Sequence, residues 1–141
     1  MIRTPELRGG EGTFFTSVND LGQIIGYYVT ASHITNGFVE FAGGYATGDN
    51  PNGIATYPYS INDLGIAVGS YLDAHGVFHS YLYDNGFSIQ DDANAGTGFF
   101  EGTVARSINI LGDIVGVYVD SNGVLHGYEE TGATFGGVCK F

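Results

Sequence analysis

One stretch of sequence occurs three times in this chain and constrains its fold more than any other feature. The copies are Ser-Val-Asn-Asp-Leu-Gly at 17–22, Ser-Ile-Asn-Asp-Leu-Gly at 60–65 and Ser-Ile-Asn-Ile-Leu-Gly at 107–112. Each is followed by a short apolar segment that ends in Gly, and the copies begin 43 and 47 residues apart. A period of this length indicates one supersecondary unit used three times.

Each repeat contains four short apolar segments separated by turn residues, and this pattern predicts four strands. The first segment ends in the Ser-x-Asn of the motif. Second strands are expected at places such as 24–29 and 114–119, third strands at 37–41, 78–83 and 125–129, and fourth strands at 45–47, 87–90 and 133–135. The 24 Gly residues and 14% aromatic residues among 141 favour short strands and tight turns over helices. We therefore expect one all-β domain of three repeats, approximately 12–53, 54–97 and 98–141, with three four-stranded antiparallel, blade-like units.

The repeated motif itself has a local explanation. Asn62 offers a side-chain acceptor at the start of a turn, and Gly65 ends it where a three-residue hairpin loop needs positive φ. The second strand that follows is apolar on both faces, as in sheets that stack face to face. Its recurring Gly lets a neighbouring sheet or ring approach closely. We interpret the tyrosine stripe on these strands (Tyr28, Tyr71, Tyr118) as packing and not as a sugar-binding platform.

The longer pattern Ser-Ile-Asn-Asp-x-Gly-x-Ile-Val-Gly-x-Tyr-x-Asp-x-x-Gly-x-x-His-Gly-Tyr resembles the HAF repeat family of bacterial extracellular proteins. The second and third repeats follow it over 60–81 and 107–128, although the third has Ile110 at the position of the turn Asp. The first repeat departs, with Thr30, His33 and Asn36 at the Asp, Gly and His positions. The resemblance covers 12–141, and it implies a β-propeller-like array of four-stranded blades and an extracellular or periplasmic location.

Three blades are fewer than the roughly four to eight of an ordinary propeller. We therefore expect the chain to form a homodimer in which two copies close a six-bladed ring and cover each other's exposed sheet edges. The alternative is a single-chain fold with internal threefold symmetry, a β-prism or a β-trefoil. Three units of four strands each would also suit those folds.

Charge limits the partners. Fifteen Asp and Glu residues oppose four Lys and Arg residues, which gives a formal net charge of −11. Such a surface repels phosphate backbones and anionic lipids, so we expect neither nucleic acid nor a membrane as a partner. The first residues lack the apolar core of a signal peptide, and no run approaches the roughly 18 apolar residues of a membrane span.

Candidate site residues gather in the longer loops. In up-and-down blades, the crossovers 48–56 and 91–103 and the loops 30–36, 73–76 and 120–123 share one edge, which we call the crossover rim. Long loops on a rigid scaffold are where binding and catalysis concentrate. Oxygen-rich runs in the two crossovers suit Ca²⁺. The expected calcium ligands are Asp49, Asn50, Asp91, Asp92 and Asn94.

Three further residues depart from the repeat pattern and are candidates for catalysis: His33, His75 and Glu101. His79 and His126 occupy equivalent strand positions and are expected to be structural. The leading functional prediction is a non-catalytic binding or scaffold module that recognises a glycan or a protein through the crossover rim. The alternative is a calcium-dependent hydrolase of lactonase or esterase type acting on a small lactone or ester, in which the cation polarises a carbonyl and His33 or His75 carries a proton.

Overall fold

The computed structural model describes residues 10–132, 134–135 and 138–139, and these residues form thirteen β-strands and no helix. None of them belongs to a helix that is long and apolar enough to cross a membrane. The prediction of an all-β fold is confirmed. The strands are β1 (Gly10–Val18), β2 (Ile24–Thr30), β3 (Thr35–Phe41), β4 (Gly44–Thr47), β5 (Ala55–Ile61), β6 (Ala67–Leu72), β7 (Phe78–Tyr83), β8 (Phe87–Ile89), β9 (Gly102–Ile108), β10 (Ile114–Val119), β11 (Leu125–Glu130), β12 (Thr134–Phe135) and β13 (Val138–Cys139).

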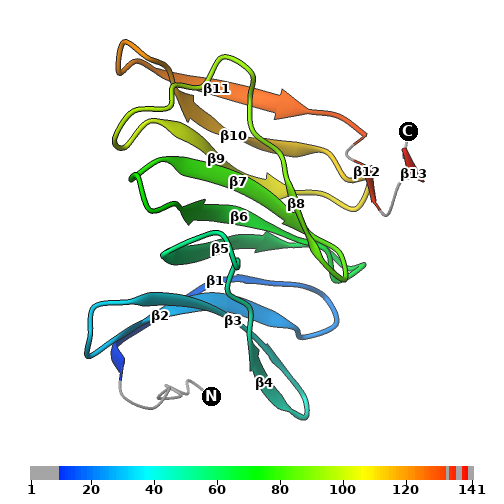
Figure 1. The fold of residues 1–141 in the computed structure, drawn as a ribbon. Coiled ribbons are helices and arrows are strands. Elements are labelled where there is room, and N and C mark those ends of the chain that lie inside the picture. The colour runs from blue at the N-terminus through cyan, green and yellow to red at the C-terminus, as the bar shows by residue number, and fades with distance from the viewer. Residues whose placement is uncertain (1–9, 133, 136–137, 140–141) are drawn as a thin grey trace.

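The strands form a four-stranded antiparallel sheet, β1-β2-β3-β4, and a curled seven-stranded sheet in the order β11-β10-β9-β7-β6-β5, with β8 paired to β7 (Figure 1). Within each repeat the first three strands are antiparallel neighbours, and in the first two repeats the fourth strand also pairs antiparallel with the third. The second and third repeats share one sheet because β7 and β9 meet in a parallel bridge between Phe78 and Gly102. A Cβ at Gly102 would lie 1.9 Å from the Phe78 carbonyl oxygen, so this junction requires glycine.

The fourth strand of the third repeat differs from the expectation. The segment predicted at 133–135 contains β12, which pairs with β13 and not with β11. Gly132, at φ +64°, turns the chain after β11, and its N–H donates to Asp113 Oδ1 at 3.2 Å. The chain is thereby drawn toward the β9–β10 turn, and β11 remains the edge strand of the large sheet.

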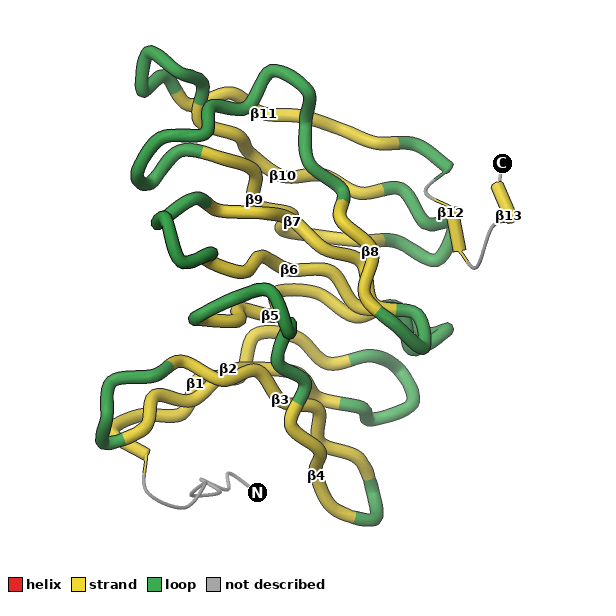
Figure 2. The backbone as a smooth tube through the Cα atoms, in the orientation of Figure 1, coloured by secondary structure: helices red, strands yellow, loops and turns green. Residues whose placement is uncertain are grey.

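The two rims of the strands carry different kinds of loop, as predicted. Figure 2 shows tight turns at one end of the sheets and the longer crossovers from β4 to β5 and from β8 to β9 at the other. In the tight turn of the second repeat, Asn62 Oδ1 accepts hydrogen bonds from Leu64 N and Ile66 N, both at 3.0 Å. Gly65 closes the turn at φ +77°. The first and third repeats have the same arrangement.

The core lies mainly between successive repeats. One cluster joins Ile25 of β2 to Ile61 and Ala67 of the second repeat. A larger cluster joins the second and third repeats through Ile66, Val68, Leu82, Ala105, Ile108 and Ile114. In the second repeat the second strand is packed on both sides, as predicted, because Ala67 and Val68 belong to the two different clusters. The prediction is wrong for the other two repeats. In the first, only the Ile25 side is covered and Ile24 pairs with the exposed Val18, and in the third, Val115 is exposed.

The glycine of the second strand meets a backbone atom at close range. A Cβ at Gly69 would lie 2.2 Å from the carbonyl oxygen of Tyr57, beside the β-bulge in β5, and 2.9 Å from the Tyr81 hydroxyl. Bulges recur at this place in all three repeats. The sequence predicted that a neighbouring sheet or an aromatic ring would approach this glycine. The Tyr81 ring does so, but the atom closest to the Cβ position belongs to the first strand of the same repeat.

Candidate functional site

A histidine between two carboxylates anchors the crossover rim of the second repeat. His79 Nε2 lies 2.9 Å from Asp73 Oδ2, and its Nδ1 lies 2.7 Å from Asp91 Oδ2. The ring stacks on Tyr71 at 5.0 Å. Partial burial disfavours the charged ring, but the hydrogen bonds to the two carboxylates outweigh it and raise the pKa of His79. The cluster is therefore an ionic junction of turn, strand and crossover.

The other oxygens of these carboxylates hold backbone groups. Asp73 Oδ1 accepts from His75 N at 2.8 Å and Val77 N at 3.0 Å, while Asp91 Oδ1 accepts from Ser80 N at 2.8 Å. Although desolvation opposes ionisation of Asp73, the hydrogen bonds from His79 and the turn lower its pKa to about 2. One aspartate thus fixes both the β6–β7 turn and the histidine.

The third repeat has the same junction in simpler form. Asp120 Oδ1 accepts from Asn122 N and Val124 N, and Asp120 Oδ2 lies 2.9 Å from His126 Nε2. His126 stacks on Tyr118 at 4.8 Å. Because the Asp-x-x-Gly-x-x-His pattern closes a turn in both repeats, the geometry supports the structural interpretation of His79 and His126.

The predicted calcium ligands occupy equivalent capping positions in the two crossovers. Asp49 Oδ1 accepts from Gly37 N at 2.9 Å, as Asp91 Oδ1 does from Ser80 N. The next residue is Asn50 in the first crossover and Asp92 in the second, and each donates its backbone N–H to a buried threonine hydroxyl. The side-chain Oδ1 of each accepts a hydrogen bond from the backbone N–H two residues later, at Asn52 and Asn94. In the described part of the chain, no three His, Cys, Asp or Glu side chains form a group that could hold a metal ion. The calcium site stays a prediction.

The three predicted catalytic residues have separate surroundings. His33 has φ +60° and its Nδ1 lies 3.0 Å from Glu11 Oε2, with both side chains mostly exposed. His75 lies exposed in the β6–β7 turn. Glu101 Oε2 accepts from Gly98 N at 2.7 Å and so ties the end of the β8–β9 crossover. No contact joins His33, His75 and Glu101 among the described residues, and the hydrolase stays a prediction.

A row of aromatic rings crosses this part of the molecule, and the sequence did not reveal it. Successive ring centroids lie 4.1–6.5 Å apart. The row passes from the first repeat through the second and ends on the β8–β9 crossover. Its members, in spatial order, are Phe14, Tyr27, Tyr57, Phe78, Phe100 and Phe99. The adjacent Phe99 and Phe100, in a crossover outside the repeat pattern, were the available signal.

The exposed end of the row is held in a strained backbone conformation. Phe100 has φ +61°, an uncommon conformation for a bulky residue, while 57% of its surface is exposed. Its N–H donates to Gly76 O at 2.8 Å and its ring stacks on Phe78 at 6.1 Å. Phe99 is 71% exposed and its ring lies over Gly76. Contacts with β7 and the β6–β7 turn therefore hold two phenylalanines toward solvent.

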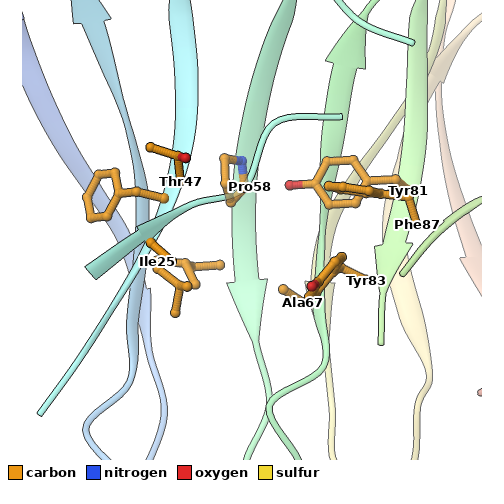
Figure 3. Close-up of a pocket in the computed structure, with 11 residues that line it drawn as sticks. Ile25, Thr47, Pro58, Ala67, Tyr81, Tyr83 and Phe87 are labelled. Carbon is orange, nitrogen blue, oxygen red and sulfur yellow. The ribbon is translucent and has the colours of Figure 1, made fainter. Parts of the chain in front are cut away.

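Two grooves lie between successive repeats and differ in polarity. The first has a volume of about 120 Å³ and is lined mainly by apolar side chains, including Ile25, Pro58 and Tyr81 (Figure 3). The second has a volume of about 320 Å³ and is lined by Asp91, Asp92, Glu129 and Glu130 among others. Burial raises the pKa of Glu130 in the second groove. The two boundaries between repeats are thus similar in construction and different in chemistry.

In comparisons with known proteins, no family model, no curated protein and no solved structure matches this chain. The resemblance to HAF repeats stays a prediction that rests on the motif residues.

Proposed function

We propose that this chain is a non-catalytic binding module that recognises a neutral glycan through its crossover rim, with Phe99 and Phe100 as the stacking residues. The observation that carries the proposal is the exposed phenylalanine pair at the end of the aromatic row. Isolated apolar residues on a surface are normal, but adjacent exposed rings held in place by strained backbone are features of interaction sites.

Charge favours a neutral ligand. The formal net charge of −11 repels anionic polysaccharides as it repels nucleic acid. Aromatic rings offer large apolar contact area with little side-chain entropy to lose, which suits the C–H faces of sugar rings. The same rim carries Asp73 and Glu101, whose carboxylates accept hydrogen bonds of the kind that sugar hydroxyls donate.

The proposal takes the three repeats as blade-like units of a propeller. Its support is the antiparallel pairing of the first three strands in each repeat and the packing of β5 and β9 against the preceding repeat. In such an array the crossovers lie at one end of the blades, where loops from neighbouring blades form a common surface.

A panel of neutral oligosaccharides on a glycan array, followed by calorimetry with the best ligand, tests the proposal. We expect Phe99→Ala and Phe100→Ala each to weaken binding about tenfold, which corresponds to about 1.4 kcal/mol. Phe41→Ala is the matched control, because Phe41 is also an exposed phenylalanine but lies at the end of β3, beside the β3–β4 turn and away from the crossover rim. A panel without binding, or binding that tolerates both substitutions, would reject the proposal. A protein partner lost with the same substitutions would identify the rim as a site for protein instead.

A further inference from the structure

The signature Ser-x-Asn of each repeat binds the next repeat as well as its own turn. Ser17 Oγ accepts a hydrogen bond from Ile61 N at 3.2 Å, and Asn19 Nδ2 donates to Asn62 O at 3.0 Å. The second boundary has the same two bonds: Ile108 N to Ser60 Oγ at 3.2 Å and Asn62 Nδ2 to Asn109 O at 3.0 Å. The motif is therefore a directional connector, with one set of groups facing forward and another facing back.

In the described part of the chain, the forward-facing groups of the third repeat contact no further repeat. Ser107 is exposed, and Asn109 Nδ2 donates within its own turn to Asp113 Oδ2 at 3.0 Å. Val115 is 48% exposed, whereas the equivalent Val68 is fully buried against the third repeat. We call this surface the forward face.

The backward-facing groups of the first repeat are equally uncovered. Val18 is 63% exposed, whereas the equivalent Ile61 is 8% exposed because the first repeat covers it. Phe15 is also exposed, although the equivalent Pro58 and Ala105 are buried. We call this surface the backward face. The first repeat lies at the bottom and the third at the top in Figure 1, so the two faces lie at opposite ends of the stack.

We propose that the forward face of one copy binds the backward face of a second copy of this chain, by the contacts that join repeats within the chain. Ser107 Oγ accepts from Val18 N of the second copy. Asn109 Nδ2 keeps one N–H on Asp113 and donates the other to Asn19 O of the second copy, just as Asn19 Nδ2 donates to both Gln23 Oε1 and Asn62 O within the chain. Two copies that use both ends form a closed ring of six repeats. The contact is heterologous, with different surfaces on the two partners.

One further detail supports a second copy as the occupant. Between the first and second repeats, Asp20 N donates to Asp63 Oδ1 at 2.8 Å. The third repeat has Ile110 in place of this aspartate and so cannot accept the equivalent bond from Asp63 N. At a joint between copies, however, Ile110 N would face Asp20 Oδ1 of the second copy, and the donor and acceptor are again matched.

One residue opposes the contact. Glu129 in the third repeat is equivalent to Val39 in the first and Leu82 in the second. Val39 and Leu82 each pack against the repeat that follows. At a joint between copies its carboxylate would lie against the apolar backward face, at a cost in desolvation. Each copy also carries a formal charge of −11, so repulsion weakens association at low salt. We therefore expect Glu129→Leu to associate more strongly than the wild type, and the wild type to associate more strongly at high salt than at low salt.

Sedimentation equilibrium of the full chain and of exposed-face variants tests the proposal. We expect a mass of twice 14.9 kDa for the wild type. Val18→Asp and Val115→Asp should each abolish association, because each destroys one half of every contact. In a mixture of the two variants, one joint of the ring is intact and the other carries both aspartates, so we expect one-to-one association that is stronger than that of either variant alone and weaker than that of the wild type.

Leu64→Asp is the matched control, because Leu64 is as exposed as Val115 but lies in a turn of the middle repeat; it should associate like the wild type. Circular dichroism would check that each variant is folded. A monomer at millimolar concentration and high salt, for both the wild type and Glu129→Leu, would overturn the proposal. A dimer that survives Val115→Asp or Val18→Asp would also overturn it.

Discussion

Replacing Asn62 tests how much the connector motif contributes to the fold. Asn62→Ala removes two hydrogen bonds to Oδ1 within the turn and the bond from Nδ2 to Asn109 O. The bond from Leu64 N and the bond to Asn109 O are each worth about 1 kcal/mol net, whereas loss of the bond from Ile66 N costs about 1–3 kcal/mol because this buried N–H is left without an acceptor. We expect the free energy of unfolding to fall by about 3–5 kcal/mol, a large part of the roughly 5–15 kcal/mol of a typical domain.

Asn109→Ala is the comparison, because Asn109 makes the same two turn bonds but its side chain is exposed and joins no following repeat. Water replaces the lost partners there, so the expected loss is about 1 kcal/mol. Asn62→Asp keeps the two turn acceptors and replaces only the connecting donor, and it should fall between the others. Urea denaturation in the Val18→Asp background keeps all variants monomeric. Equal losses for Asn62→Ala and Asn109→Ala would refute the connecting role.

Three further predictions concern pH and packing. The raised pKa of His79 adds stability below about pH 6.5 that is lost at higher pH, and the pKa of about 2 for Asp73 adds stability above about pH 3.8 that is lost in acid. The urea concentration at the midpoint of unfolding should therefore be highest between these two pH values. His79→Gln should remove the loss of stability on the alkaline side. Leu82→Ala should cost about 2–5 kcal/mol in thermal unfolding, since Leu82 is buried between two repeats; a loss below 1 kcal/mol would contradict this packing. Gly69→Ala should cost more than 1 kcal/mol because its Cβ would overlap a carbonyl oxygen, whereas Gly43→Ala, which meets only ordinary contacts, should be nearly neutral.

The features that the sequence predicted are those settled within a few residues. The turn at Asn62 and Gly65 formed as expected because acceptor, donors and the positive-φ glycine all lie within one hairpin loop. The all-β class and the difference between the two rims followed from the same local signals. The strands 78–83 and 114–119 were predicted with the bounds that the structure gives them, since turn residues flank both.

The features that only the tertiary structure decided depend on contacts between residues far apart in the chain. Asn19 and Asn62 also bind the next repeat, through a carbonyl oxygen 43 or 47 residues away, and nothing in the sequence of a single repeat reveals this contact. The fusion of the second and third repeats rests on one bridge at Gly102. The aromatic row joins Phe14 to Phe99 only because four strands and the β8–β9 crossover meet in space. Local geometry thus fixes the repeat, whereas the packing of repeat on repeat fixes which of its side chains remain exposed to bind a partner.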